Sequence, residues 1–407
     1  MNEYKLIPGG ITAVQSFKAS GVHAGLKKAK KDLALIYSEL PAVAAGVFTT
    51  NKVKAAPLLY DMEQLKAPTC RAIVVNSGNA NACTGVQGLE DAKAMAVKTA
   101  EELGCKVEEV LVSSTGVIGV RMPMDKVLAG IPKAVQELSA EGGPLAAEAI
   151  MTTDTFPKEI SFKFELAGQE VTIGAMAKGS GMIHPNMGTM LGFITTDAAI
   201  TKDLLQETLV AVVEKTFNMI TVDGDTSTND MVVVLANGSA GNKLLTSKDD
   251  PGYQSFYDAL SFACTYLAKE IARDGEGATK LLTVQVLAAL TEQDARLAAK
   301  AVCSSSLVKT ALFGEDANWG RILAAIGYSG AEFDPGKVRI WIKSEAGEEQ
   351  VADGGAGLLF DEEKAKKILA AEEVFIVVDL NQGEAEATAW GCDLTYDYVK
   401  INGSYRT

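Results

Sequence analysis

The stretch Lys178–Leu191, KGSGMIHPNMGTML, brings small and turn-forming residues up to a single threonine, Thr189, and the apolar run MLGFITT that follows predicts a buried strand. A threonine hydroxyl is a poor nucleophile unless a base stands beside it. One solution is for the threonine to become a chain N-terminus, because its own α-amine then serves as the base. That amine has an ordinary pKa of roughly 7.7–8.0, so much of it is unprotonated near neutral pH. The solution requires cleavage of the Gly188–Thr189 bond.

The residues before Thr189 suit self-cleavage. The threonine hydroxyl would attack the preceding carbonyl, and water would resolve the resulting ester. Backbone strain favours this N-to-O shift, and Gly188 can adopt conformations that are closed to other residues. Pro185 fixes its own φ and restricts His184 before it. Taken alone, however, the same spacing is more typical of a glycine-rich loop that leads into a strand.

Composition describes an ordinary globular chain with an acidic balance. The 407 residues are enough for two domains or one large layered unit, with 47% apolar and 22% charged residues. The net charge of -14, without a long Lys/Arg block, argues against nucleic acid and anionic membrane partners. The N-terminus lacks the apolar core of a signal peptide, so a cytoplasmic location is expected.

Cysteine and histidine usage narrows the chemistry further. Six cysteines without a CxxC pair are typical of free, mostly buried thiols in a reducing compartment. His23 and His184 are the two histidines, which disfavours a His-based zinc site or a Ser-His-Asp triad. No metal site is therefore predicted.

The first half of the chain alternates short strands with helices. Strands are expected at 72–75 and 110–112, each followed by a small-residue loop, and a helix is expected from about Asp91 to Leu103. This rhythm is typical of α/β or mixed α+β folds. The polar stretch SAEGGP (139–144) is a candidate domain boundary.

The second half continues the mixed pattern. Thr201 is expected to cap a helix in which Leu205, Leu209 and Val212 share one face. The runs NMITV (218–222) and DMVVVLA (230–236) are expected to be a strand pair around the loop DGDTSTN. Further strands are expected at 337–343 and 373–380.

Long blocks throughout the chain match one family. Besides 178–198 they are GVFTTNKVKAAP (46–57), VVNSGNANACTG (74–85), SSTGVIG (113–119), IMTTDTFPK (150–158), FNMITVDGDTSTND (217–230), RDGEGATK (273–280), SLVKTALFGEDANWGRILAAIGYSG (306–330) and INGSYRT (401–407). With these blocks the chain resembles the ornithine acetyltransferase (glutamate N-acetyltransferase, ArgJ) family of arginine biosynthesis. One departure is Gly188, where the family more often has alanine; glycine keeps the residue small, so cleavage is still expected, at a rate that the change can alter.

The resemblance implies a fold and a subunit composition. The fold would be α+β, a layered helix/sheet/sheet/helix sandwich of the self-processing DmpA/ArgJ-like type. Self-cleavage would divide the chain into an alpha chain, 1–188, and a beta chain, 189–407, which stay associated and form an α2β2 heterotetramer.

The resemblance also assigns residue roles. Thr189 would be the nucleophile, and Thr115 and Gly116 would form the oxyanion hole through a hydroxyl and a backbone N–H. The substrate would be bound by Thr153 (chosen over Thr152 and Thr155), Lys178, Thr189, Glu276, Asn402 and Thr407. A lysine and a glutamate match the carboxylate and the side-chain ammonium of ornithine. Residues so near the C-terminus are usually frayed, so the tail must be pinned if it lines a site.

The implied reaction is a ping-pong transfer. N2-acetyl-L-ornithine would acetylate Thr189, and L-glutamate would accept the acetyl group, with no metal and no organic cofactor. Some family members also take acetyl-CoA as the donor. The sequence leaves that open, because it holds no recognisable CoA-binding motif.

Other interpretations remain open at this point. On the same self-cleaving scaffold, an aminopeptidase or amidohydrolase would use water to resolve the acyl-enzyme. The DxD of MITVDGDTST is similar to that of aspartyl-phosphate phosphatases, with Asp223 as nucleophile, but Ser227 stands where that motif has threonine; Asp223, Asp225 and Asp230 are more simply expected to order a loop. The SxxK at Ser306–Lys309 lacks its partner motifs and is expected to be a helix start. A non-catalytic binding protein would show neither cleavage nor acetylation.

Overall fold

A computed structural model describes residues 4–184 and 190–404. The chain divides into two compact units: unit 1 comprises 1–179, 186–214 and 226–267, and unit 2 comprises 180–185, 215–225 and 268–407. The units do not follow the division at Gly188–Thr189, because each contains residues from both sides of it. The α+β prediction is confirmed, with one sheet in each unit.

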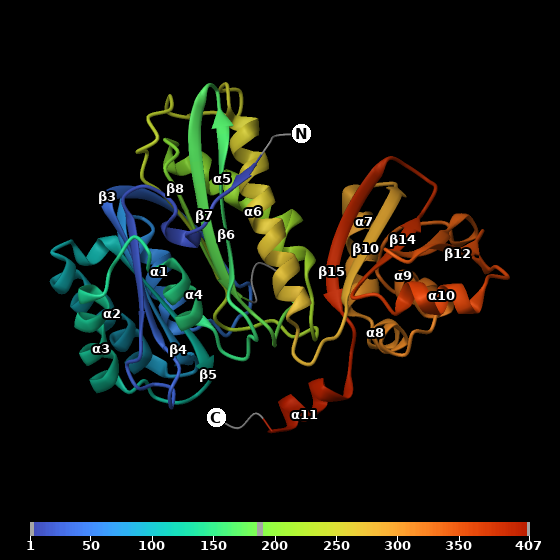
Figure 1. Ribbon diagram of the computed structural model, residues 1–407, viewed down its shortest axis with the longest axis horizontal. Coiled ribbons are helices and arrows are strands. Elements are labelled where there is room, and N and C mark those ends of the chain that lie inside the picture. The colour runs from blue at the N-terminus through green and yellow to red at the C-terminus, as the bar shows by residue number, and fades with distance from the viewer. Residues whose placement is uncertain (1–3, 185–189, 405–407) are drawn as a thin grey trace. The chain divides into compact units, whose positions relative to one another are not determined.

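The described part of unit 1 contains a nine-stranded sheet (Figure 1). Its strands are β1 (Lys5–Leu6), β2 (Phe17–Val22), β3 (Leu33–Phe48), β4 (Cys70–Asn79), β5 (Val110–Val117), β6 (Lys158–Leu166), β7 (Gln169–Lys178), β8 (Leu191–Thr196) and β9 (Met231–Ala236). They run in the order β1-β6-β7-β8-β9-β3-β4-β5, and β2 pairs with β3. The predicted strands at 72–75, 110–112 and after Thr189 are therefore confirmed.

Strand β3 joins the two halves of this sheet. Its first part, 33–37, pairs with β4, and its last part, 43–48, pairs with β9. Pro41 lies at the change of partner, where a residue without an N–H costs no ladder hydrogen bond. Apolar side chains from both halves, among them Ile36, Phe193 and Val233, pack in one cluster. The long strand thus bends the sheet around a shared core.

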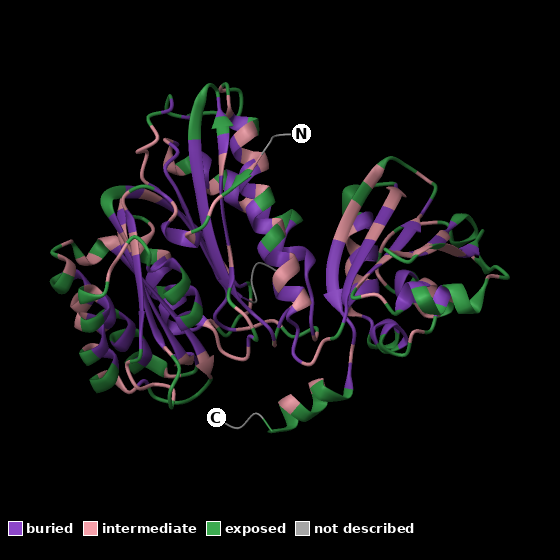
Figure 2. Ribbon diagram, in the orientation of Figure 1, coloured by how far each residue is buried: buried purple, intermediate pink, exposed green. Residues whose placement is uncertain are grey.

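Helices cover the sheet of unit 1. They are α1 (Ala56–Gln64), α2 (Gly85–Leu103), α3 (Met124–Gln136), α4 (Gly143–Ile150), α5 (Lys202–Lys215) and α6 (Tyr253–Arg273), the last two reaching into the segments assigned to unit 2. Helices α2 and α3 lie side by side against β3, β4 and β5, and α4 packs on the other core (Figure 1). In Figure 2 these helices alternate between buried and exposed residues, whereas β8 and β9 are buried throughout.

The described part of unit 2 contains a six-stranded sheet. Its strands are β10 (Leu281–Ala289), β11 (Arg339–Ser344), β12 (Gly347–Asp353), β13 (Ala356–Gly357), β14 (Glu373–Asp379) and β15 (Ala385–Cys392), in the order β13-β12-β11-β14-β10-β15. Its helices are α7 (Glu292–Ser304), α8 (Ser306–Phe313), α9 (Trp319–Gly327), α10 (Glu362–Leu369) and α11 (Tyr396–Ser404). The expected strands at 337–343 and 373–380 are confirmed.

Three local predictions are corrected. NMITV is not a strand: Phe217–Met219 is a 3-10 helix, and Ile220 forms one isolated bridge, because this buried run has no ladder partner. Helix α2 starts six residues earlier than predicted, at Gly85, in a stretch whose glycines resemble a loop. SAEGGP is no boundary: Ser139 exchanges two backbone hydrogen bonds with Ala19 inside unit 1.

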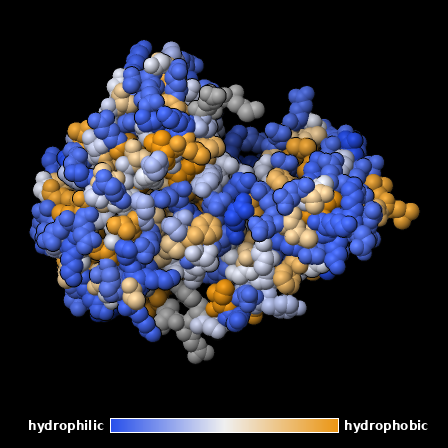
Figure 3. Space-filling view, in the orientation of Figure 1, coloured by the Kyte–Doolittle hydropathy of each residue, from blue (hydrophilic) through white to orange (hydrophobic). Residues whose placement is uncertain are grey.

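On the face drawn in Figure 3, hydrophilic side chains predominate and hydrophobic ones are scattered. No helix in the described residues is both long and apolar enough to span a membrane.

Candidate active site

Thr189, Gly188 and Thr407 lie outside the described residues, so the site is built from their neighbours. Met190, bonded to Thr189, accepts a hydrogen bond through its carbonyl from Met231 N at 3.0 Å. Leu191 then starts β8, which lies between β7 and β9. The chain after the expected cut is therefore hydrogen-bonded to β9 from its second residue and belongs to the sheet from its third.

Thr115 and Gly116 lie at the carboxyl end of β5, beside the end of the parallel strand β4. Thr115 is buried, and Gly116 has a φ of +133°, in the region that favours glycine. A Cβ at Gly116 would lie 2.6 Å from Asn79 N, closer than real side chains come. Since polar groups at the carboxyl ends of parallel strands commonly face a ligand, this geometry suits an oxyanion hole.

Asn229 supports these strand ends, although the sequence did not predict this role. Its amide nitrogen donates to Ala80 O at 2.6 Å and to Ser114 O at 2.8 Å. Asn229 belongs to the DGDTSTND block, in which a role was predicted for the acidic residues and none for the asparagine. Its only sequence signal was a place in a family block.

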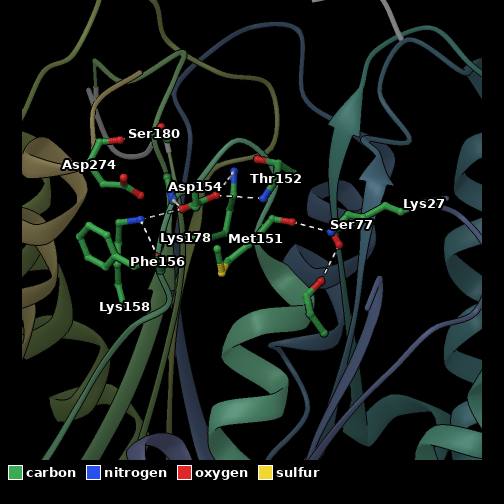
Figure 4. A network of polar contacts seen from close by, with 12 residues as sticks. Lys27, Ser77, Met151, Thr152, Asp154, Phe156, Lys158, Lys178, Ser180 and Asp274 are labelled. Carbon is green, nitrogen blue, oxygen red and sulfur yellow. Dashed lines mark hydrogen bonds and ion pairs between the residues drawn. The ribbon is translucent and has the colours of Figure 1, made fainter. Parts of the chain in front are cut away.

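Lys178 and the turn at 152–154 come together around Asp154 (Figure 4). The Asp154 carboxylate is fully buried; it accepts from Lys158 Nζ at 2.8 Å, and its Oδ2 lies 4.0 Å from Lys178 Nζ. It also accepts from Thr152 N at 2.9 Å and Gly179 N at 2.7 Å. The hairpin of β6 and β7 explains this, because its register sets Lys158 opposite Ala177, the neighbour of Lys178.

The charged groups of this cluster shift one another's pKa values. Burial alone would raise the pKa of Asp154, but the charges of Lys178 and Lys158 outweigh it and hold that pKa below its usual range. Burial, aided by the charge of Lys178, lowers the pKa of Lys27 to about 8. Lys27 Nζ donates to Met151 O at 2.6 Å, on the same turn. The cluster thus places two buried lysines, Lys158 and Lys178, beside one buried carboxylate, with the half-buried Lys27 bonded to the same turn.

Asp154→Asn should lower the free energy of unfolding by roughly 3–5 kcal/mol, because it removes the negative charge that the buried Lys158 and Lys178 share. The expected result is a clear fall in Tm by calorimetry. The control is Glu170→Gln, which removes the carboxylate from the exposed pair Lys163–Glu170 and should leave Tm unchanged within error. Equal shifts in both variants would contradict the assigned role of Asp154.

Glu276 and Asn402 are brought together in unit 2. Asn402 Nδ2 donates to Glu276 Oε2 at 2.8 Å and to Tyr398 O at 3.1 Å. Glu276 is 9% exposed, whereas the described residues of α11 include none that is buried. The described part of the tail is thus held by polar contacts rather than by burial.

The remaining motifs have structural explanations. Asp223 accepts from the backbone N–H groups of Met182 and Ile183, so its loop-ordering role is confirmed. Ser306 begins α8, as expected for a helix start, and Lys309 Nζ is buried and donates to Val222 O at 2.6 Å. Thr153 is half-buried beside Asp154. The six cysteines are free thiols, four of them buried.

Each histidine has a polar neighbour among the described residues. His23 Nδ1 contacts Lys30 O at 2.9 Å, and His184 Nδ1 lies 3.0 Å from Thr221 Oγ1. Burial, aided by the charge of Lys300, lowers the pKa of His184 to about 4, so its imidazole is neutral at pH 7. Among the described residues no group of three His, Cys, Asp or Glu could hold a metal ion.

Comparison with known proteins identifies the family. The model of the ArgJ family matches residues 18–407. The chain belongs to the ArgJ family. The arginine biosynthesis bifunctional protein ArgJ of Caldanaerobacter subterraneus subsp. tengcongensis is 58% identical over 403 residues, covering 99% of this chain and 100% of that relative. The ArgJ of Bacillus subtilis (strain 168) is 50% identical over 402 residues, covering 98% and 97%.

A solved structure agrees with the ArgJ assignment. A chain of the arginine biosynthesis bifunctional protein argJ from Bacillus halodurans matches with a TM-score of 0.51 and 51% identity. The match covers 53% of this chain and 100% of that one. The family and the acyltransferase class inferred from the sequence are confirmed: the chain is an acyltransferase of arginine biosynthesis.

Proposed function

We propose that this chain cuts itself at Gly188–Thr189 and transfers acetyl from N2-acetyl-L-ornithine to L-glutamate through an acetyl-Thr189 intermediate. The observation that carries the proposal is the family match over residues 18–407, which takes in every residue given a role above. Water, rather than glutamate, would resolve the intermediate in an amidohydrolase.

The proposed acetyl transfer needs neither a metal nor an organic cofactor. Thr189 Oγ attacks the acetyl carbonyl while the α-amine accepts its proton. The Thr115 hydroxyl and the Gly116 N–H stabilise the oxyanion, and its collapse expels ornithine, whose amine takes up the proton. The amine of glutamate then attacks the acetyl ester and gives a proton to the α-amine of Thr189, which passes it to Oγ as N-acetylglutamate leaves.

The ligand is bound by groups of opposite charge. Lys178, largely buried, suits the carboxylate of the amino acid, and Glu276 suits the side-chain ammonium of ornithine. Thr153, Asn402 and Thr407 complete the binding set.

The sheet of unit 1 supports a stable pair of fragments, 1–188 and 189–407. Strand β8 pairs with β7 and β9 pairs with β3, so the two strands of the second fragment lie between strands of the first. The relative from Bacillus halodurans adds support, since its solved chain matches about half of this one over its whole length, the size of one such fragment. We propose that the fragments form an α2β2 heterotetramer and that it lies in the cytoplasm. Light scattering, which measures the mass of the assembly, tests the heterotetramer.

The names of the curated relatives favour a second activity. They are called bifunctional, so we propose that acetyl-CoA also donates to Thr189, which would make N-acetylglutamate directly. Both donors should label the same threonine. The test is to supply each donor with isotopically labelled glutamate and to compare N-acetylglutamate formation in wild type and Thr189→Ala, which should lose both activities.

The decisive experiment is intact mass spectrometry combined with a product assay. Wild type should give two fragments, the second beginning TMLGF, and N-acetylornithine should add one acetyl group to that fragment. With glutamate present, N-acetylglutamate should form faster than free acetate. Faster acetate formation would instead support the amidohydrolase.

A further inference from the structure

The Asp223 carboxylate binds the backbone that precedes the expected cut. Its Oδ2 accepts from Met182 N at 2.6 Å, and its Oδ1 accepts from Ile183 N at 2.8 Å. Met182 has a φ of +56°, which is uncommon for a residue other than glycine. Two successive N–H groups thus converge on one anion, an arrangement in which charge-assisted hydrogen bonds are strong.

The same segment is held on both sides within unit 2. Ser180 Oγ donates to Asp274 O at 2.6 Å, and Ser180 O accepts from Glu276 N at 3.0 Å. Val222 N donates to Ile183 O at 2.7 Å. Residues 180–183 therefore lie bound between the loop that carries Asp223 and the loop that carries Glu276.

This segment also packs directly against the carboxylate of Glu276. A Cβ at Gly181 would lie 2.5 Å from Glu276 Oε1, so the backbone of Gly181 already fills that side of the carboxylate. Glu276 in turn accepts from Asn402. A displacement of residues 181–183 would therefore change the surroundings of the Glu276–Asn402 pair.

Tyr398 connects the same carboxylate to helix α11. Its hydroxyl donates to Asp223 Oδ2 at 3.3 Å, and its carbonyl accepts from Asn402 Nδ2. Burial and the negative charge of Asp223 raise the pKa of Tyr398, which keeps the phenol protonated as a donor. Because the described part of α11 buries no residue, this contact and the Glu276–Asn402 bond do much to position the helix.

We propose that Asp223 is a positioning residue for substrate binding. Its carboxylate holds residues 181–183 beside Glu276 and, through Tyr398, holds the helix that carries Asn402. The Glu276–Asn402 pair thereby keeps one geometry toward the ligand. The inference rests on the proposed function in one respect, the assignment of Glu276 and Asn402 as ligand-binding residues.

The test is Asp223→Asn, which keeps the size of the side chain but points an amide N–H₂ group at one of the two backbone donors. The KM for N-acetylornithine should rise about tenfold, as expected for the loss of a charge-assisted bond, while kcat of the cut enzyme stays within about threefold. Asp225→Asn is the matched control, because Asp225 is exposed on the same loop; its KM should be unchanged.

Tyr398→Phe provides a second, milder test that removes one hydroxyl. It should raise KM about threefold without slowing kcat. An unchanged KM in Asp223→Asn overturns the inference; if that variant does not fold, an unchanged KM in Tyr398→Phe overturns it. Wild type without transferase activity would instead refute the proposed function, so the two failures are distinguishable.

Discussion

Thr189→Ala should give a single uncut chain whose acetyl transfer is lower by about 10⁴–10⁶-fold, as expected when an enzyme loses its covalent nucleophile. The hydroxyl is needed twice, first to attack the Gly188 carbonyl and then to carry the acetyl group. Intact mass measures the first role, and N-acetylglutamate formation measures the second.

Two further variants separate the role of the Thr189 hydroxyl in cleavage from its role in acetyl transfer. Thr189→Ser keeps a hydroxyl and should still be cut and active, although more slowly. Co-expression of 1–188 with a separate 189–407 that begins with alanine bypasses cleavage, and this pair should still be inactive. Co-expression is required because β8 and β9 complete a sheet whose other strands belong to the first fragment. An active uncut chain would eliminate the α-amine as base and refute the mechanism.

Thr115→Val should lower kcat by about 10²–10³-fold, the usual effect of removing one oxyanion donor, with KM within about threefold. Valine has nearly the shape of threonine and suits a strand, and Thr115 lies in β5, so the fold should tolerate the change. The variant should still bind N-acetylornithine.

Ser113→Ala is the matched control for Thr115→Val. Ser113 lies two residues earlier on the same face of β5, and its Oγ is buried without a hydrogen-bond partner in the described part of the chain. Its kcat should stay within about twofold of wild type. If both variants lost activity equally, the cause would be the packing of β5 rather than the hydroxyl of Thr115.

The spacing of apolar residues along the chain correctly predicted the helices and strands that bury one apolar face. Leu205, Leu209 and Val212 are buried on α5 as their spacing predicts, and β14 and β11 follow their apolar runs. The run 217–222 failed because all its apolar residues are buried, and such a run does not tell a strand from an irregular crossing segment.

Chemistry that depends on distant residues was harder to predict. Asp154 followed by Lys158 is a pattern typical of an exposed loop. In the structure both side chains are buried, and the β6–β7 hairpin brings Lys178 into the same cluster. Asn229 stabilises the ends of β4 and β5 from more than a hundred residues away in the sequence. Neither pairing has a periodic signal in the chain.

The amino-acid order was sufficient for the family, the α+β class and the expected nucleophile, because these depend on long continuous motifs such as that around Thr189. The three-dimensional arrangement was needed for the counter-charge of Lys178, the support of Thr115 and Gly116, and the Asp223–Tyr398 contact with the Glu276–Asn402 pair. Each of these is a short-range polar interaction between segments far apart in the chain. Hydrogen bonds and buried charges act over a few ångströms, so such interactions exist only where the sheets and turns bring the partners together.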